Sequence, residues 1–322
     1  MKTQTKLSLL AGCLILAGAI TFVSCKKTSN PTTPKSYNTS GTADNNTADN
    51  TSKDLNNIGA EAIGSGTLTT YKLSAGQGNG GVISPMSGSV VIFVDSIPNK
   101  WLTVTFSNFV GYDGHTRNGT IKYNWSGSTC SSPYYFEKNG FDVIISSPSN
   151  DYYVDGNHVV INQKEVKNIG VDANGCYNWT DVANINIVKA NNGGTISWTH
   201  NGNMILVNTN AITYNGVNVN GVYPTSGGFI DWLHAIIGFT GTVTGTTASG
   251  DAYTATITTR VDYNMNCSPI SGTLWQYFHP PVAGALDYVQ GGVTYNINYG
   301  SQTCDDTYVV TVGTWSVSLS FI

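Results

Sequence analysis

Tryptophan side chains are the groups in this chain whose chemistry best suits a neutral ligand. The sequence contains seven Trp and 18 Tyr, many of them in polar contexts rich in Gly and Asn. Trp125, Trp179 and Trp198 lie in such contexts, and an indole offers a large apolar face together with an N–H donor. Exposed on a β-sheet, the three indoles would form a platform on which sugar rings stack. The competing interpretation is core or cross-strand packing, which most aromatic residues of β-proteins adopt.

Acidic and histidine side chains show no spacing that is typical of catalysis or metal binding. A glycosidase needs two carboxyl groups about 5–9 Å apart across a cleft, yet the chain has only three Glu, and its Asp residues fall mainly at expected turns. The histidines are scattered beside turns, where we expect isolated surface side chains: His115, His158, His200, His234 and His279. We therefore predict no catalytic residue, no metal ligand and no cofactor, and favour a binding protein over an enzyme.

The N-terminus has the layout of a secretory leader. A basic segment, residues 1–6, precedes an apolar run over residues 7–23, and the chain becomes polar directly after Cys25. A cysteine in this place resembles the cleavage site of bacterial lipoprotein signals. The resemblance implies that residues 1–24 are removed, that the thiol of Cys25 carries a diacylglycerol, and that the protein is anchored in a lipid bilayer outside the cytoplasm.

Two other interpretations of this segment stay open. Cys13 follows Leu-Ala-Gly, a better match to the consensus, but cleavage there would leave an apolar run shorter than the usual length of about 7–15 residues. An uncleaved membrane helix is the second alternative, at the lower limit for a span. We favour the anchor at Cys25 in the outer membrane. Lys26 and Lys27 point toward its periplasmic face, and the cell surface remains the alternative.

Composition divides the remaining chain into a tether and a folded part. Residues 25–57 are mostly Ser, Thr, Asn, Pro and Lys, which predicts a disordered, lipidated tether. Residues 58–322 are expected to form the ectodomain, either as one body or as two halves, 58–190 and 191–322. After the leader the chain has 13 basic and 19 acidic residues and no basic run, which argues against a nucleic-acid partner.

Alternation of apolar and polar residues indicates that the ectodomain is all-β. It is clear at 101–106, 120–125 and 253–258, where β-branched and aromatic residues share one face. Asn-Gly or Asp-Gly occurs ten times along the chain, and these dipeptides favour the tight turns of β-hairpins. We predict an antiparallel, sandwich-like fold or two stacked β subdomains.

Four cysteines of the ectodomain predict disulfides, because an exported protein with an even number of Cys usually forms them. Three connectivities are possible for Cys130, Cys176, Cys267 and Cys304. We favour Cys130–Cys176 and Cys267–Cys304, which would staple each half within itself. A zinc site is disfavoured because no two of these cysteines have the spacing of metal ligands.

Three short motifs resemble those of uncharacterised β-rich lipoproteins from Bacteroidota. They are an Arg-x-Gly-x-Ile segment at 117–121, a Tyr-x-Val-x-Gly hairpin at 151–156, and a Tyr-Gly-x-x-x-Cys-Asp segment at 299–305. The turn resembling Asp-Phe-Gly that such proteins carry is replaced by Phe-Ser-Asn at 106–108. The resemblance spans roughly residues 90–322 and implies an anchored β-rich body without assigned catalytic residues.

These observations together predict an extracytoplasmic, membrane-anchored lipoprotein that acts as a binding or structural module of the cell envelope. Its partners would be the bilayer, through the acyl anchor, and a glycan or an envelope protein. A carbohydrate-binding, adhesin-like surface protein is the first alternative, and a hydrolase of envelope or dietary polysaccharide is the second.

Overall fold

The structure is a computed structural model. The chain divides into two compact units, residues 1–37 and residues 38–322. The second unit holds every element described below. The described residues are 37–64, 71–73, 87–95, 100–111, 114–129, 139–171, 177–207, 213–214, 217–218, 225–226, 229–230, 236–264, 281–305 and 307–320. Cys25 and residues 26–36 of the expected tether lie outside them.

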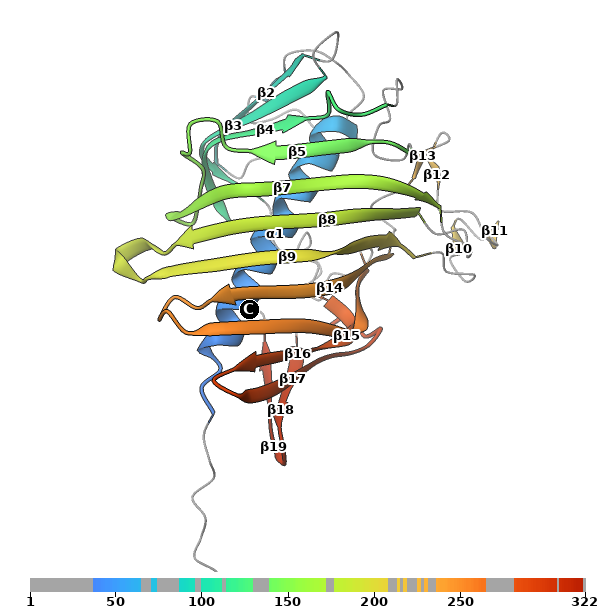
Figure 1. Ribbon diagram of the computed structural model, residues 1–322. Helices are drawn as coiled ribbons and strands as arrows, with labels where there is room; N and C mark the ends of the chain where they lie inside the picture. The colour runs from blue at the N-terminus through green and yellow to red at the C-terminus, as the bar shows by residue number, and fades with distance from the viewer. Residues whose placement is uncertain are drawn as a thin grey trace, which may run out of the picture. The chain divides into compact units, whose positions relative to one another are not determined.

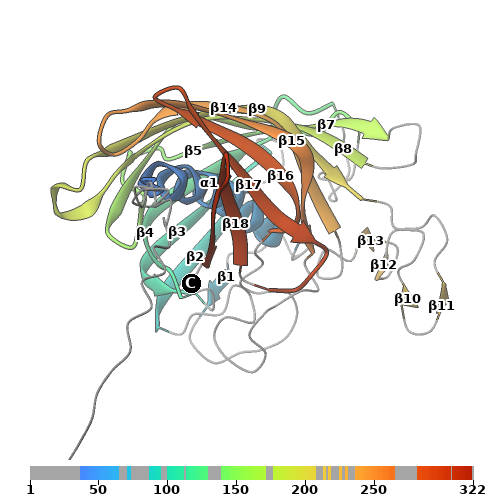
Figure 2. The same cartoon turned by 90° about the horizontal axis from the view of Figure 1, so that it is seen from below.

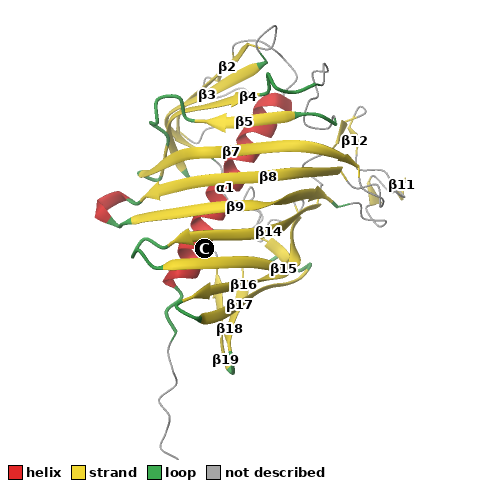
Figure 3. Ribbon diagram, viewed as in Figure 1, coloured by secondary structure: helices red, strands yellow, loops and turns green. Residues whose placement is uncertain are grey.

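One long helix precedes the strands, and Figures 1 and 3 show their arrangement. The elements are α1 (Ser40–Gly64), β1 (Tyr71–Leu73), β2 (Ser87–Asp95), β3 (Trp101–Val110), β4 (Thr116–Asn124), β5 (Asp142–Ser146), β6 (Tyr153–Val154), β7 (Asn157–Val171), β8 (Tyr177–Val188), the 3₁₀ turn η2 (Ala190–Asn192), β9 (Thr195–Leu206), β10 (Thr213–Tyr214), β11 (Val217–Asn218), β12 (Thr225–Ser226), β13 (Phe229–Ile230), β14 (Ile236–Thr246), β15 (Ala252–Asn264), β16 (Pro281–Gln290), β17 (Val293–Ser301), β18 (Thr307–Val312) and β19 (Trp315–Ser320).

Fifteen of the described strands form a single antiparallel sheet, which confirms the all-β prediction. Its order is β1-β2-β3-β4-β5-β7-β8-β9-β14-β15-β16-β17-β18-β19, and β6 pairs with both β4 and β7. Two separate hairpins, β10–β11 and β12–β13, fall between β9 and β14 in sequence. Residue 190, the boundary expected between two halves, lies in the turn η2, and the strands on either side of it, β8 and β9, pair with each other, so the sheet continues across that boundary.

A tight turn of the expected kind joins β6 and β7. Asp155 and Gly156 have φ values of +51° and +77°, and a type I′ turn requires a positive φ at both of its central residues. Asp155 also accepts a hydrogen bond from the backbone N–H of Thr116, 2.8 Å away, so its carboxylate holds the turn against β4. The Asp-Gly dipeptide therefore has the role that the sequence predicted for it.

The sheet is strongly curved, and α1 lies along its concave side (Figure 2). Apolar side chains from alternate positions of the strands line much of the inner face of the sheet. On β8 these positions are Trp179, Ala183, Ile185 and Ile187, all buried. On α1, Leu55 is fully buried. The core of this unit thus lies between one helix and the inner face of one sheet.

Helix α1 corrects the prediction of a disordered tether, which extended to residue 57. The helix begins at Ser40, where its N–H donates to the side chain of Asn38 over 2.9 Å. Its buried face is largely polar, and the buried polar residues are Thr42, Asp44, Asn45, Ser52 and Asn56. The small number of apolar residues does not predict this helix, because its buried face is polar and the sheet supplies the polar partners. No helix in the described part of the chain is both long and apolar enough to cross a membrane.

Candidate functional site: the polar seam beneath helix α1

Charged and polar side chains meet where α1 crosses the middle of the sheet, and we call this cluster the polar seam. Its members are Asp49, Ser52, Lys53 and Asn56 of α1, Lys164 of β7, Asp181 of β8, His200 of β9 and Tyr263 of β15. The helical members are three or four residues apart, so they share one side of the helix. The sheet members occupy inward positions that otherwise hold core residues.

The centre of the polar seam is a buried ion pair between Lys164 and Asp181. The Lys164 ammonium also donates to the hydroxyl of Ser52 over 2.9 Å, and the amide of Asn56 donates to the second oxygen of Asp181 over 2.9 Å. Burial raises the pKa of Asp181, but the nearby charge of Lys164 and these hydrogen bonds lower it more, so the net shift is below its usual value. Asp181 is therefore an ionised carboxylate held in the core.

A second group, one turn toward the start of α1, joins Lys53 to Asp49 and to the hydroxyl of Tyr263. The Lys53 ammonium also lies 4.0 Å from the ring centre of Tyr263 and 4.5 Å from that of Phe239. Burial lowers the pKa of Lys53 despite the charge of Asp49. Burial and Asp49 together raise the pKa of Tyr263 well above its usual value, so this phenol stays protonated.

A cavity of about 30 Å³ adjoins Asp49, Lys53 and His200, and its remaining walls are mainly apolar. That volume has room for about one or two molecules the size of water. The ring of His200 stacks on Trp198, with 5.4 Å between ring centres, and its Nδ1 has no hydrogen-bond partner among the described residues. Burial lowers the pKa of His200, because a charged imidazole is poorly solvated there.

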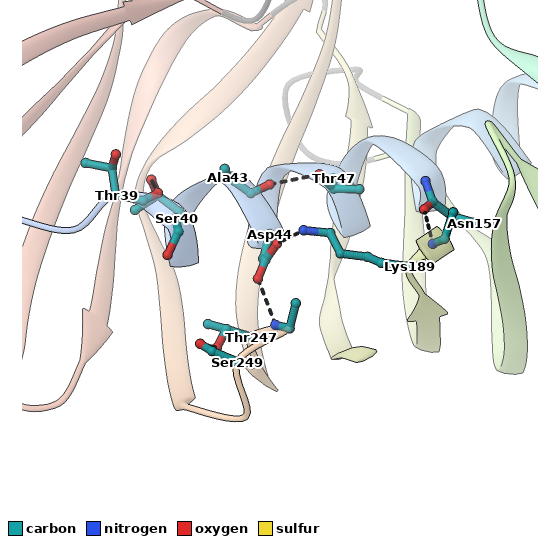
Figure 4. A network of polar contacts seen from close by, with 12 residues as sticks. Thr39, Ser40, Ala43, Asp44, Thr47, Asn157, Lys189, Thr247 and Ser249 are labelled. Atoms are coloured by element: carbon teal, nitrogen blue, oxygen red, sulfur yellow. Dashed lines mark hydrogen bonds and ion pairs between the residues drawn. The ribbon is translucent and has the colours of Figure 1, made fainter. Parts of the chain in front are cut away.

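The start of α1 is fixed to two turns of the sheet through Asp44 (Figure 4). One oxygen of its carboxylate lies 2.6 Å from the ammonium of Lys189, after β8. The other accepts a hydrogen bond over 2.8 Å from the backbone N–H of Ala248, between β14 and β15. Beyond Asp44, the amide oxygen of Asn45 accepts a hydrogen bond from the indole of Trp198 over 3.3 Å.

The second half of α1 is fixed to β4. The guanidinium of Arg117 donates to both carboxylate oxygens of Asp54, over 3.0 and 2.7 Å. The hydroxyl of Tyr123 donates to the carbonyl of Leu55 over 2.7 Å. Gly59 then packs directly on the Tyr123 ring, where a Cβ would stand 2.4 Å from a ring carbon. Helix and sheet are thus locked together along about four turns of α1, from Asp44 to Gly59.

The three tryptophans predicted to bind a ligand are core residues instead. Trp125, Trp179 and Trp198 are 1%, 0% and 1% exposed, so a sugar-stacking platform made of them is excluded. The competing interpretation, core packing, is confirmed for all three. Trp179 and Trp198 fall on the inward side because the alternation of β8 and β9 places them there, and Trp125 follows directly after β4, two residues beyond the buried Tyr123.

The histidine prediction is partly wrong. His115 is half exposed and lies 2.6 Å from Asp155, as expected for a surface residue beside a turn. His200 is only 5% exposed because it shares the inward side of β9 with Ile196 and Trp198. Asp305 accepts hydrogen bonds from the N–H and hydroxyl of Thr307, both over 3.0 Å, and so serves its own turn.

The alternation of the strands contains a signal for the polar seam. Asp181 falls in the inward series of β8, between Trp179 and Ala183, and Lys164 falls two residues before the buried Val166. A charged residue on the apolar side of a strand requires a buried partner. The partner on α1 has no such signal, because Asn56 lies 125 residues from Asp181 in sequence.

The cysteine predictions are tested at one position. Cys304 is disulfide-bonded. Cys130, Cys176 and Cys267 lie outside the described residues, so the proposed pairing stays a prediction. In the described part of the chain, no group of three or more His, Cys, Asp or Glu side chains is arranged to hold a metal ion.

Comparisons with protein-family models, with curated proteins and with solved structures found no match to this chain.

Proposed function

We propose that the protein is a lipid-anchored module of the cell envelope, with a binding or structural role outside the cytoplasm, and that α1 connects its anchor to its β-sheet. The anchor is Cys25, expected in the outer membrane with the body on the periplasmic face or at the cell surface. The partners would be the bilayer and a glycan or an envelope protein.

The observation that carries this proposal is the position of α1. The helix begins at Ser40, so 14 residues separate it from Cys25. At no more than about 3.6 Å per residue, that segment spans less than about 55 Å. An anchor joined by so short a segment to a helix that is locked to the sheet would keep the body within about that distance of the bilayer.

The contacts of α1 suit an attachment with a defined position. Asp44, Asp54 and Asn56 each bind a different part of the sheet, at the β8 and β14 ends, at β4 and at the centre. Buried ion pairs contribute little net stability, but a displaced helix would leave several charges buried without partners. The polar contacts therefore specify one position for the helix.

The geometry does not support the specific sites that the two alternative functions were expected to use. The sugar platform of Trp125, Trp179 and Trp198 is excluded by burial. A hydrolase would need two carboxylates or a Ser–His pair converging in a deep pocket. The described residues that line the cavity beneath α1 include one carboxylate, Asp49, and the cavity has the size of a water site.

The anchor is tested by metabolic labelling with palmitate in a bacterial host that processes lipoproteins. We expect Cys25→Ser to abolish labelling and to release the body from the washed membrane fraction. The matched control is Cys13→Ser, which should remain labelled and membrane-bound. Labelling that persists in Cys25→Ser, or that is lost in Cys13→Ser alone, would show that the anchor is misassigned. Protease treatment of intact cells would then distinguish the cell surface from the periplasmic face.

A further inference from the structure

The convex side of the sheet carries a regular array of short hydrogen-bonding side chains, which we call the Thr/Asn array. It covers β8, β9, β14 and β15 on the side opposite α1. Its members, all exposed or partly exposed, are Thr180, Asn184, Asn186, Ser197, Thr199, Asn201, Asn203, Thr240, Thr242, Thr244, Thr246, Thr254 and Thr256.

Strand register aligns these side chains in rows. One row runs through Thr199, Thr244 and Thr254, which face one another across β9, β14 and β15. The next row runs parallel to it through Asn201 and Thr242, and continues to Thr256. Neighbouring members are about 4.8 Å apart across the strands and about 6.8 Å apart along them. The array is therefore a two-dimensional grid.

Charge is absent from the centre of this grid. Strands β9 and β14, and the segment 252–259 of β15, contain no Asp, Glu, Lys or Arg. A surface of about 25–35% charged residues is the recommended design for solubility, because a net charge near zero promotes association. The array is not apolar either, since hydroxyl and amide groups dominate it. It thus lacks the cations that bind nucleic acid and the apolar area that enters a bilayer.

Most side chains of the array have free hydrogen-bonding capacity, whereas the amide oxygen of Asn184 accepts a hydrogen bond from Asn162 over 3.0 Å. No hydrogen bond within the described part of the chain occupies the hydroxyls of Thr199, Thr244 or Thr254. Each hydroxyl can donate and accept, and each Asn amide has two donors and an acceptor. Threonine is branched at Cβ and keeps few rotamers, so it loses little side-chain entropy when a ligand binds.

We propose that the Thr/Asn array is a binding surface for a neutral polysaccharide. Sugar hydroxyls have the same donor and acceptor character as the array and carry no charge. A polymer lying across the strands would meet the same groups repeatedly, and many weak bonds would add to useful avidity. The inference deepens the binding role proposed above and rests on that role, but not on the lipid anchor.

The test uses the whole protein in detergent micelles, so that its outcome does not depend on Cys25. Binding is measured by co-sedimentation with insoluble cellulose, chitin and β-1,3-glucan. The variant Thr199→Lys/Thr244→Glu places opposite charges on a facing pair at the centre of the array without changing the net charge. The matched control is Thr105→Lys/Thr120→Glu, a facing pair of threonines on β3 and β4, outside the array.

We expect wild type to bind at least one of these polymers, the array variant to bind at least tenfold more weakly, and the control to bind within about twofold of wild type. If the array variant does not fold, Thr199→Val/Thr244→Val removes the same hydroxyls and keeps the shape of the side chains. Failure of wild type to bind any of the polymers overturns the proposal, as does equal binding by array variant and control. Self-association of wild type that only the array variant abolishes would also overturn it, because the occupant would then be a second copy. If the protein does not bind polysaccharide but is still labelled by palmitate, the proposal for the array fails and the proposal for the anchor stands.

Discussion

Replacing Lys164 by Met is the sharpest test of the polar seam. The substitution keeps much of the length of the side chain and removes its charge. In the protein, Lys164 is fully buried on β7, forms an ion pair with Asp181 and donates to Ser52 over 2.9 Å. The variant would leave the Asp181 carboxylate, itself only 2% exposed, with Asn56 as its remaining partner in the polar seam.

The expected loss follows from the cost of an unpaired buried charge. Removing one partner of such a pair typically destabilises a protein by about 3–5 kcal/mol. The matched control is Lys167→Met, three residues further along the same strand. Lys167 pairs with Asp142 over 3.1 Å, but its side chain is 47% exposed. A pair so open to solvent contributes about 0–1 kcal/mol, so the control should unfold almost as wild type does.

Acid should reduce the difference between Lys164→Met and wild type. In wild type the pKa of Asp181 is lower in the folded protein than in the unfolded chain, where it is about 3.9. Ionisation of Asp181 therefore stabilises the fold above about pH 3.9, and this contribution is lost as pH falls through the folded-state pKa. Without Lys164, burial raises the pKa of Asp181 instead. Protonation then relieves the unpaired charge, and the loss of stability should be smaller at pH 4.5 than at pH 7.

Urea unfolding followed by circular dichroism measures both effects, provided that the variants share one m-value. The double variant Lys164→Met/Asp181→Leu should recover a large part of the loss, because it leaves no buried charge. The reasoning is refuted if Lys164→Met costs no more than Lys167→Met at pH 7, or if the double variant is less stable than Lys164→Met.

Two further predictions concern the contact between α1 and the sheet. Because the pKa of His200 is lowered in the folded protein, the unfolded chain takes up a proton on this side chain at a higher pH, and stability should fall as pH drops below about 6.5. The variant His200→Asn should flatten this dependence in unfolding curves measured at pH 5–7. An unchanged slope in the variant would contradict the prediction. The variant Gly59→Ala should destabilise the protein by about 1–3 kcal/mol, because the new Cβ would overlap the Tyr123 ring. The control Gly127→Ala places a Cβ with no neighbouring atom within 4 Å and should stay within about 0.5 kcal/mol of wild type. Equal melting temperatures for the two variants would refute the close contact.

The strands and many of their turns could be predicted from the sequence because their causes are local. Alternation in 101–106 and 253–258 follows from the two-residue period of a strand, and both segments are strands of the sheet. Asp155-Gly156 adopts the expected turn because its φ values suit those two residue types. The same local pattern also places Trp179 and Trp198 on the inward side, although composition alone suggested a ligand-binding role for them.

The candidate site could not be predicted in this way because its parts are distant in sequence. The residues between 40 and 57 have too few apolar side chains to indicate a buried helix. They are buried because the concave sheet presents Lys189, Arg117, Lys164 and Asp181 at matching positions. Polar burial of this kind depends on partners, and nothing in a local pattern identifies a partner more than a hundred residues away.

The sequence by itself therefore determined that this protein is a chain of antiparallel strands with tight hairpin turns. It did so because side-chain alternation and turn conformation are properties of neighbouring residues. Only the tertiary structure decided that these strands form one curved sheet, that α1 lies inside it, and that Lys164 and Asp181 face each other in its core. Those features depend on how strand twist accumulates across the sheet and on which charges can be paired once water is excluded.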